Sequence, residues 1–156
     1  MKFEYWVIGK TKENYFNASE QEFLKRIQKF CRLTYKTFPE AKATNNDAQV
    51  IKTKEKEMIL SNINDQDYLI LLDEKGKEFT SIAFSEKINT LQLSTYKRVI
   101  FLTGGAYGFH ESLHDRGNEK LSLSKMTFSH QMVRTFFLEQ FYRAFTILNN
   151  EKYHNE

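Results

Sequence analysis

Three groups of residues in the last third of the chain have the types and spacing that a ligand site needs. The turn from Thr103 to Gly108 holds three glycines, which tolerate positive φ angles and let the backbone approach a ligand closely. Hydroxyl and apolar side chains alternate from Leu121 to Ser129, and His130 follows them. A tight strand-to-helix turn and an ordinary capped helix would explain the same residues, because serine is a common N-cap.

The helix expected over 130–148 carries the titratable residues of this region. At 100° per residue, His130 and Arg134 fall on one stripe with three phenylalanines. Such polar side chains are often hydrogen-bonded for purely structural reasons, but beside a glycine turn and a hydroxyl-rich loop they favour a site. The helix is apolar nearly all round, so we expect one side to meet the sheet and another to meet a second copy of the chain.

The sequence lacks the complete motifs of other common catalytic and metal-binding sites. The glycine turn lacks the G-x-G-x-x-G order of a dinucleotide site and the Gly-Lys-Ser/Thr ending of a P-loop. Cys31, the only cysteine, lies in a helical apolar pattern, which argues against a thiol nucleophile. His110 and His114 have i,i+4 spacing without the central glutamate of a zinc helix, so we expect no metal site.

Alternating strands and helices are expected to position these residues. The predicted strands cover 2–8, 33–38, 68–72, 98–102 and 121–124, the last as a short strand or extended loop, and the predicted helices cover 19–32, 52–63, 81–91, 109–116 and 130–148. This order predicts a single α/β domain over 1–156, with a mostly parallel sheet flanked by helices. Ligands bind beyond the carboxyl ends of parallel strands, which favours the turns after Leu72 and Leu102.

Composition indicates an ordinary folded protein. Of the 156 residues, 28% are charged and 40% hydrophobic, and one proline and six glycines argue against a linker-rich or disordered chain. A net charge of +3 permits nucleic-acid binding without requiring it. A single cysteine excludes an internal disulfide and fits a cytosolic setting. Residues 1–8 alternate in polarity, so we expect neither a signal peptide nor a membrane span there.

Six short motifs in register resemble one family closely. They are Leu71–Lys77 (L-D-x-x-G-K), Phe101–Gly108 (F-x-x-G-G-x-x-G), Leu121–Thr127 (L-S-x-S-x-M-T), His130–Arg134 (H-Q-x-x-R), Glu139–Ala144 (E-Q-x-Y-R-A) and the terminal Tyr153-His154. The chain thus resembles the RlmH-type ribosomal RNA large subunit methyltransferases of the SPOUT superfamily over its whole length. It departs from them at Ser129, where the family often has proline, although both residues can begin a helix.

The resemblance implies a C-terminal trefoil knot, a homodimer and S-adenosylmethionine as the methyl donor. The implied reaction is methyl transfer to N3 of a pseudouridine in the 23S rRNA of the assembled ribosome, in the cytoplasm. Carried over by position, the residues that line the donor are Leu72, Gly105, Ser124, Lys125, Met126, Thr127, Phe128 and Ser129.

Three residues are candidates for the chemistry itself. His130 has an ordinary pKa near neutrality and could take the proton from N3. Arg134 could stabilise the oxyanion that develops on the base, or bind phosphate. The partner's His154 is a rival base. The alternative function is a non-catalytic RNA-binding module. It would explain the lysine, arginine and phenylalanine content, but not the glycine turn over 103–108 or the hydroxyl-rich segment over 121–129, which we call the serine loop.

Overall fold

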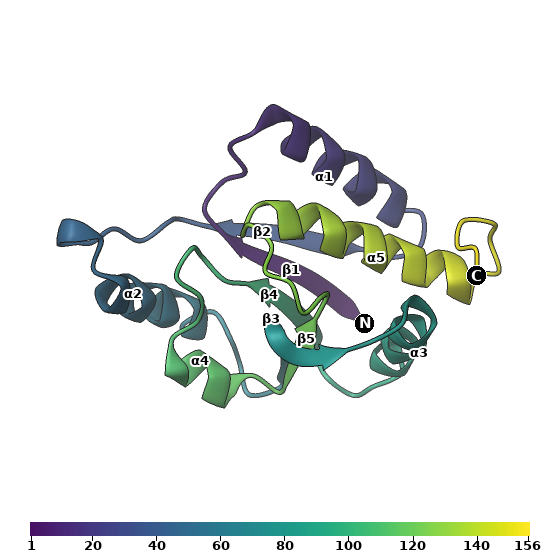
Figure 1. The fold of residues 1–156 in the computed structure, drawn as a ribbon. Helices are drawn as coiled ribbons and strands as arrows, with labels where there is room; N and C mark the ends of the chain where they lie inside the picture. The colour runs from purple at the N-terminus through teal and green to yellow at the C-terminus, as the bar shows by residue number, and fades with distance from the viewer.

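Five parallel strands form the centre of the fold, in the order β2-β1-β4-β3-β5 (Figure 1). The computed structural model describes residues 1–156, and the strands are β1 (Lys2–Ile8), β2 (Leu33–Phe38), β3 (Asp67–Glu78), β4 (Arg98–Thr103) and β5 (Glu119–Ser122). The expected α/β class and largely parallel sheet are confirmed. The region over 121–124 is a strand that begins at Glu119 and ends at Ser122.

Helices cover both faces of this sheet. They are α1 (Asn14–Ile27), α2 (Ala48–Leu60), α3 (Ser81–Gln92), α4 (Glu111–Arg116) and α5 (Met132–Leu148), with a short 3₁₀ helix over Thr44–Asn46. In Figure 1, α1, α5 and α3 lie on one face, and α2 and α4 lie on the other. None of these helices is both long and apolar enough to cross a membrane.

Strand alternation produces two hydrophobic cores. Along β1, Tyr5 and Val7 point to one face, while Trp6 and Ile8 point to the other. The larger core joins the sheet to α1, α3 and α5, and the smaller one joins it to α2 and α4. Since both faces are covered, the central strands read as continuous apolar runs, as expected for buried parallel strands.

Two helices begin earlier than their sequence patterns indicated. Ser19 and Glu22 have the spacing of a capping box, which predicts Ser19 as the N-cap of the first helix. In the structure Ser19 lies inside α1, where its hydroxyl bonds with Phe16 O and Thr135 Oγ1, and Glu22 pairs with Arg26. The second helix begins at Ala48 because the Asp47 carboxylate accepts hydrogen bonds from the N–H groups of the first turn.

The third strand is longer than expected and passes through the region that looked like a turn. β3 continues to Glu78, and its register against β5 shifts between Leu72 and Lys77. At Gly76 the backbones come so close that a Cβ would lie 2.6 Å from the carbonyl carbon of Lys120. Glycine is therefore required there for strand approach.

The final helix is covered on both flanks by its own chain. α5 packs against α1 on one side and α3 on the other, and its phenylalanine stripe is fully buried on the sheet. Helical periodicity does not reveal this coverage, because it does not place α1 and α3 beside α5. The large apolar side chains left exposed on α5 are Met132 (38%) and Phe136 (42%).

Candidate functional site

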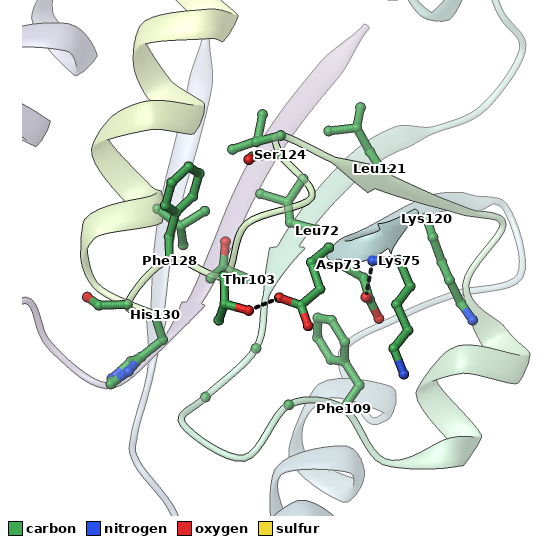
Figure 2. Close-up of a pocket in the computed structure, with 18 of the residues that line it drawn as sticks. Leu72, Asp73, Lys75, Thr103, Phe109, Lys120, Leu121, Ser124, Phe128 and His130 are labelled. Atoms are coloured by element: carbon green, nitrogen blue, oxygen red, sulfur yellow. Dashed lines mark hydrogen bonds between the residues drawn. The ribbon is translucent and has the colours of Figure 1, made fainter. Parts of the chain in front are cut away.

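A pocket of about 780 Å³ opens at the carboxyl ends of β3, β4 and β5 (Figure 2). Its walls come from three segments, 72–75, 103–109 and 120–130, together with His114 and Val133. Seven of the eight expected donor-site residues line it, namely Leu72, Gly105, Ser124, Met126, Thr127, Phe128 and Ser129. The eighth, Lys125, points its side chain into solvent, where it is 87% exposed and lies 3.8 Å from Glu78.

The glycine turn is shaped by close contacts and by one positive φ angle. A Cβ on Gly104 would lie 3.1 Å from the Phe109 ring, and one on Gly105 would lie 2.9 Å from Oε1 of Glu55. Of the three glycines of the turn, only Gly108 has a positive φ, at +78°. The first two are in close contact with neighbouring side chains, and the third is favoured for its backbone conformation.

Glu55 is a buried acid that sequence reasoning missed. It projects from α2 to the underside of the glycine turn and is 4% exposed. Desolvation, with a smaller contribution from Glu40, raises the pKa of its carboxyl to about 7. No sequence signal distinguished it, because a glutamate among lysines on a helix usually faces solvent.

The floor of the pocket contains a buried hydroxyl pair. Thr103 ends β4 and its Oγ1 lies 2.7 Å from the hydroxyl of Tyr5, in the middle of β1. Burial raises the pKa of Tyr5 well above its ordinary value, so the phenol remains protonated. Tyr5 looked like an ordinary strand residue in the sequence, and only the pairing of β1 with β4 brings it under the pocket.

Local hydrogen bonds give the serine loop its shape. Ser122 Oγ donates to the carbonyl of Ser124, and the hydroxyl of Ser124 accepts from the N–H of Met126. Thr127 Oγ1 donates to the carboxylate of Glu74 on β3, which ties the loop across the pocket. Ser129 Oγ accepts from the N–H of Met132 at 3.1 Å, but the prediction that it is the N-cap was wrong, because α5 begins at Met132 and Gln131 holds the N-cap position.

His130 stands half-buried at the edge of the pocket, beyond Phe128 (Figure 2). Burial lowers its pKa, and the positive charges of Arg134 and Lys12 lower it further, while Glu40 opposes them. The imidazole is therefore neutral at pH 7 and has a nitrogen available to accept a proton.

Arg134 is completely buried and does not line the pocket. Its guanidinium donates to the carbonyls of Ile8 and Gly9, at 2.8 and 2.9 Å, and to Thr11 Oγ1 at 3.1 Å. A buried arginine is often paired with a carboxylate, but the acceptors of Arg134 are two backbone carbonyls and a hydroxyl. These contacts hold the end of β1 against the start of α5.

The terminal Tyr153-His154 pair folds back against α5. His154 Nδ1 is 3.2 Å from the guanidinium of Arg143, and the Tyr153 hydroxyl donates to Glu139. Arg143 lies about 16 Å along the helix from Met132, the first residue of α5. His154 therefore does not meet His130 within one chain.

The remaining histidines and the cysteine take structural positions. His110 Nδ1 accepts from the N–H of Ser112 and caps α4, while the His114 ring packs on Phe109. No group of three or more His, Cys, Asp or Glu side chains is arranged to hold a metal ion. Burial raises the pKa of the Cys31 thiol to about 11, so it stays protonated at neutral pH.

Comparison with known proteins decides the family. Residues 1–154 match the family described as predicted SPOUT methyltransferase. The chain belongs to this SPOUT methyltransferase family. A methyltransferase of this family requires a methyl donor.

Relatives match this SPOUT methyltransferase over nearly its entire length. A protein of Cytophaga hutchinsonii is 46% identical over 155 residues, which cover 99% of this chain and all of the relative. One from Parabacteroides distasonis is 48% identical and fully covered on both sides, and one from Christiangramia forsetii is 48% identical over 95% of each chain. All three are named ribosomal RNA large subunit methyltransferase H.

The residues present in this SPOUT methyltransferase suit a methyl donor of nucleoside size. A volume of about 780 Å³ lies within the usual range for small-molecule and cofactor sites. The Gly104–Gly105 backbone forms one wall, and the serine loop supplies hydroxyls opposite Leu72. The combination of apolar walls with a few converging polar groups is typical of such sites.

Proposed function

We propose that this single-domain chain, over residues 1–156, transfers a methyl group from S-adenosylmethionine to N3 of a pseudouridine in the 23S rRNA of the assembled ribosome, in the cytoplasm. The observation that carries the proposal is the pocket with a neutral histidine at its edge. The printed names of the relatives support ribosomal RNA as the substrate.

The donor would lie between the turn at Gly105, the end of β3 at Leu72, and the loop 124–129. When bound, S-adenosylmethionine supplies an electrophilic methyl group. Leu72 and Phe128 would exclude water from it, and the hydroxyls of Ser124 and Thr127 would orient its polar parts. Lys125 would contribute through its backbone, because its side chain points into solvent.

His130 would accept the proton that leaves N3 of the target base. A neutral imidazole is the form that can do so, and the low pKa of His130 keeps that form dominant at pH 7. Arg134 would act as a positioning residue in this conformation, since it is buried and bound to the end of β1. The partner's His154 remains the rival base.

We propose further that the chain works as a homodimer. Within one chain, His154 contacts Arg143, which lies about 16 Å along α5 from the helix start beside His130, beyond hydrogen-bond reach. A two-fold arrangement with antiparallel α5 helices would bring the tail of one protomer to the pocket of the other. Met132 and Phe136 are exposed beside the pocket-lining Phe128, which favours this surface for the contact.

We also propose the C-terminal trefoil knot that the family resemblance implies. In support, β5 lies at the outer edge of the sheet, while α5 returns to pack between α1 and α3, and the connecting segment shares the pocket with residues 103–109.

Pulling the chain ends apart in an optical trap is expected to give a contour length shorter than the ~3.3–3.6 Å per residue of a fully extended, unknotted chain. A full-length contour would contradict the knot.

Replacing Gly105 with arginine is expected to abolish donor binding. A Cβ alone would lie 2.9 Å from the Glu55 carboxylate, and a long side chain must enter the pocket or push the turn away. Isothermal titration with S-adenosylmethionine should show saturable binding by the wild type and none by Gly105→Arg.

The matched control is Leu93→Arg, which adds the same charge at a residue that is 79% exposed. It should bind the donor as the wild type does, and circular dichroism should show both variants folded. If Gly105→Arg bound with unchanged affinity, the donor site would lie elsewhere. A wild type that binds RNA but no donor would favour the non-catalytic RNA-binding module.

A further inference from the structure

The last residue of β1 and the segment that follows it are held against the start of α5 by five hydrogen bonds. Three come from Arg134, to Ile8 O, Gly9 O and Thr11 Oγ1. Two come from Gln131, whose amide accepts from the N–H of Lys12 at 2.9 Å and donates to the carbonyl of Lys10 at 3.1 Å. The acceptors and donors on the segment are nearly all backbone atoms, so its path is fixed while its side chains stay free.

The side chains left free in this way are two lysines beside His130. Lys10 and Lys12 are both exposed, and neither takes part in any of the ion pairs of the chain. Lys12 is near enough to His130 for its charge to lower the pKa of the imidazole. The nearby acids are Glu13, which precedes α1, and Glu40, whose side chain reaches Gly9.

We infer that Lys10 and Lys12 bind backbone phosphates of the RNA that flank the target nucleotide. The inference rests on the proposed function, and it assigns a substrate-binding role to a segment outside the donor pocket. Ammonium groups on a rigid backbone suit phosphates, because phosphate contacts set the register of an RNA without reading its sequence. The buried arginine and Gln131 are then positioning residues, since they hold the segment that carries the lysines beside the histidine.

The two lysines compensate locally for the low net charge of the chain. The chain carries only +3 overall, so non-specific attraction to RNA is modest. Two pre-positioned cations at the site give local attraction without a strongly basic surface. The charge of Lys12 also depresses the pKa of His130, which keeps the imidazole neutral next to a polyanion that would otherwise raise it.

The test is methylation of ribosomal particles that lack the modification, by the Lys10→Ala/Lys12→Ala variant. We expect the ribosome concentration for half-maximal rate to rise on the order of tenfold, with kcat changed much less. The salt dependence of binding should weaken by about one unit of slope for each phosphate that the variant no longer neutralises. The affinity for S-adenosylmethionine should be unchanged by calorimetry.

The matched control removes two other exposed lysines, Lys25 on α1 and Lys97 at the amino end of β4. This variant has the same net charge and should keep the wild-type half-saturating concentration. NMR titration gives a readout independent of activity, because Lys12→Ala should raise the pKa of His130 toward its ordinary value. Gln131→Ala, which keeps both charges but removes two hydrogen bonds to the segment, should also raise the half-saturating concentration.

Two outcomes separate this inference from the function on which it rests. If the wild type methylates the particles and Lys10→Ala/Lys12→Ala shows the same half-saturating concentration and salt slope, the phosphate-binding role is wrong and the proposed function stands. If the wild type binds the donor but methylates no ribosomal RNA, the proposed function itself is wrong.

Discussion

His130→Ala is expected to slow methyl transfer in a single turnover by ~10²–10⁴-fold, the usual range for removing a positioned general base. The imidazole stands at the edge of the pocket and is neutral at pH 7, so in the wild type it can take the N3 proton as the new N–C bond forms. Donor binding should persist in the variant, because the other wall residues remain. The measurement combines rapid-quench kinetics at saturating ribosome with calorimetry of the donor.

The pH profile gives the same prediction a second measurement. Burial and the charges of Arg134 and Lys12 lower the pKa of His130 below its ordinary 6.5. The wild-type rate should therefore rise with pH as the imidazolium gives up its proton, and reach its plateau at a lower pH than a histidine of ordinary pKa would allow. The lowered pKa also affects the stability of the fold. At acid pH the unfolded chain binds a proton at His130 more readily than the folded chain does, which lowers the free energy of unfolding. This loss of stability disappears as the pH rises above the ordinary pKa of histidine.

A histidine at a structural position provides the control for this substitution. His110→Asn keeps a side chain that can cap α4 and should leave both rate and pH profile unchanged. If His130→Ala transferred methyl groups at nearly the wild-type rate with normal donor affinity, the base assignment would be wrong, and the partner's His154 would become the first candidate.

A heterodimer of His130→Ala and His154→Ala protomers is expected to keep about half of the wild-type rate per dimer, whereas each mutant homodimer loses most of it. The reason is geometric, since His154 contacts Arg143, about 16 Å along α5 from the helix start beside His130 in the same chain. If each site takes the tail of the other protomer, one site of the heterodimer has both histidines and the other has neither. Purification through two different affinity tags isolates the heterodimer for assay.

The control for this experiment places both substitutions in one protomer. Paired with a wild-type protomer, it leaves one defect in each site if tails are exchanged, so the heterodimer should be inactive. If tails are not exchanged, the outcome reverses, and this heterodimer keeps half of the activity. A chain that sediments as a monomer at assay concentrations would overturn the shared site altogether.

Local patterns in the sequence were sufficient for the class of fold and for most of the residues that line the pocket. Wholly apolar runs such as 68–72 fit strands covered on both faces, and the carboxyl ends of parallel strands meet at one edge of the sheet. Leu72 and Gly105 could therefore be assigned to one site although they lie in different segments. Ser129 was expected near the start of the last helix, and its hydroxyl does accept from the N–H of Met132, although Gln131 holds the N-cap position.

Local patterns gave the wrong prediction where a residue could bond either to a near neighbour in the sequence or to a residue far away in the chain. Ser19 and Glu22 have the spacing of a capping box, but Ser19 bonds to Thr135 on α5 instead, a contact that no local rule contains. The length of β3 was underestimated for a similar reason. Its extension through Gly76 is stabilised by pairing with β5, more than 40 residues later in the chain.

The sequence by itself determined the chemistry of the pocket, namely a glycine turn, a hydroxyl-rich loop and a histidine, because these depend on residue type and short spacing. Only the tertiary structure decided what surrounds them. Glu55 lies under Gly105, Tyr5 bonds to Thr103, and Arg134 turns away from the pocket to hold the end of β1. These contacts join residues far apart in the chain, and a buried polar group takes whichever partner the packed helices and strands bring within about 3 Å.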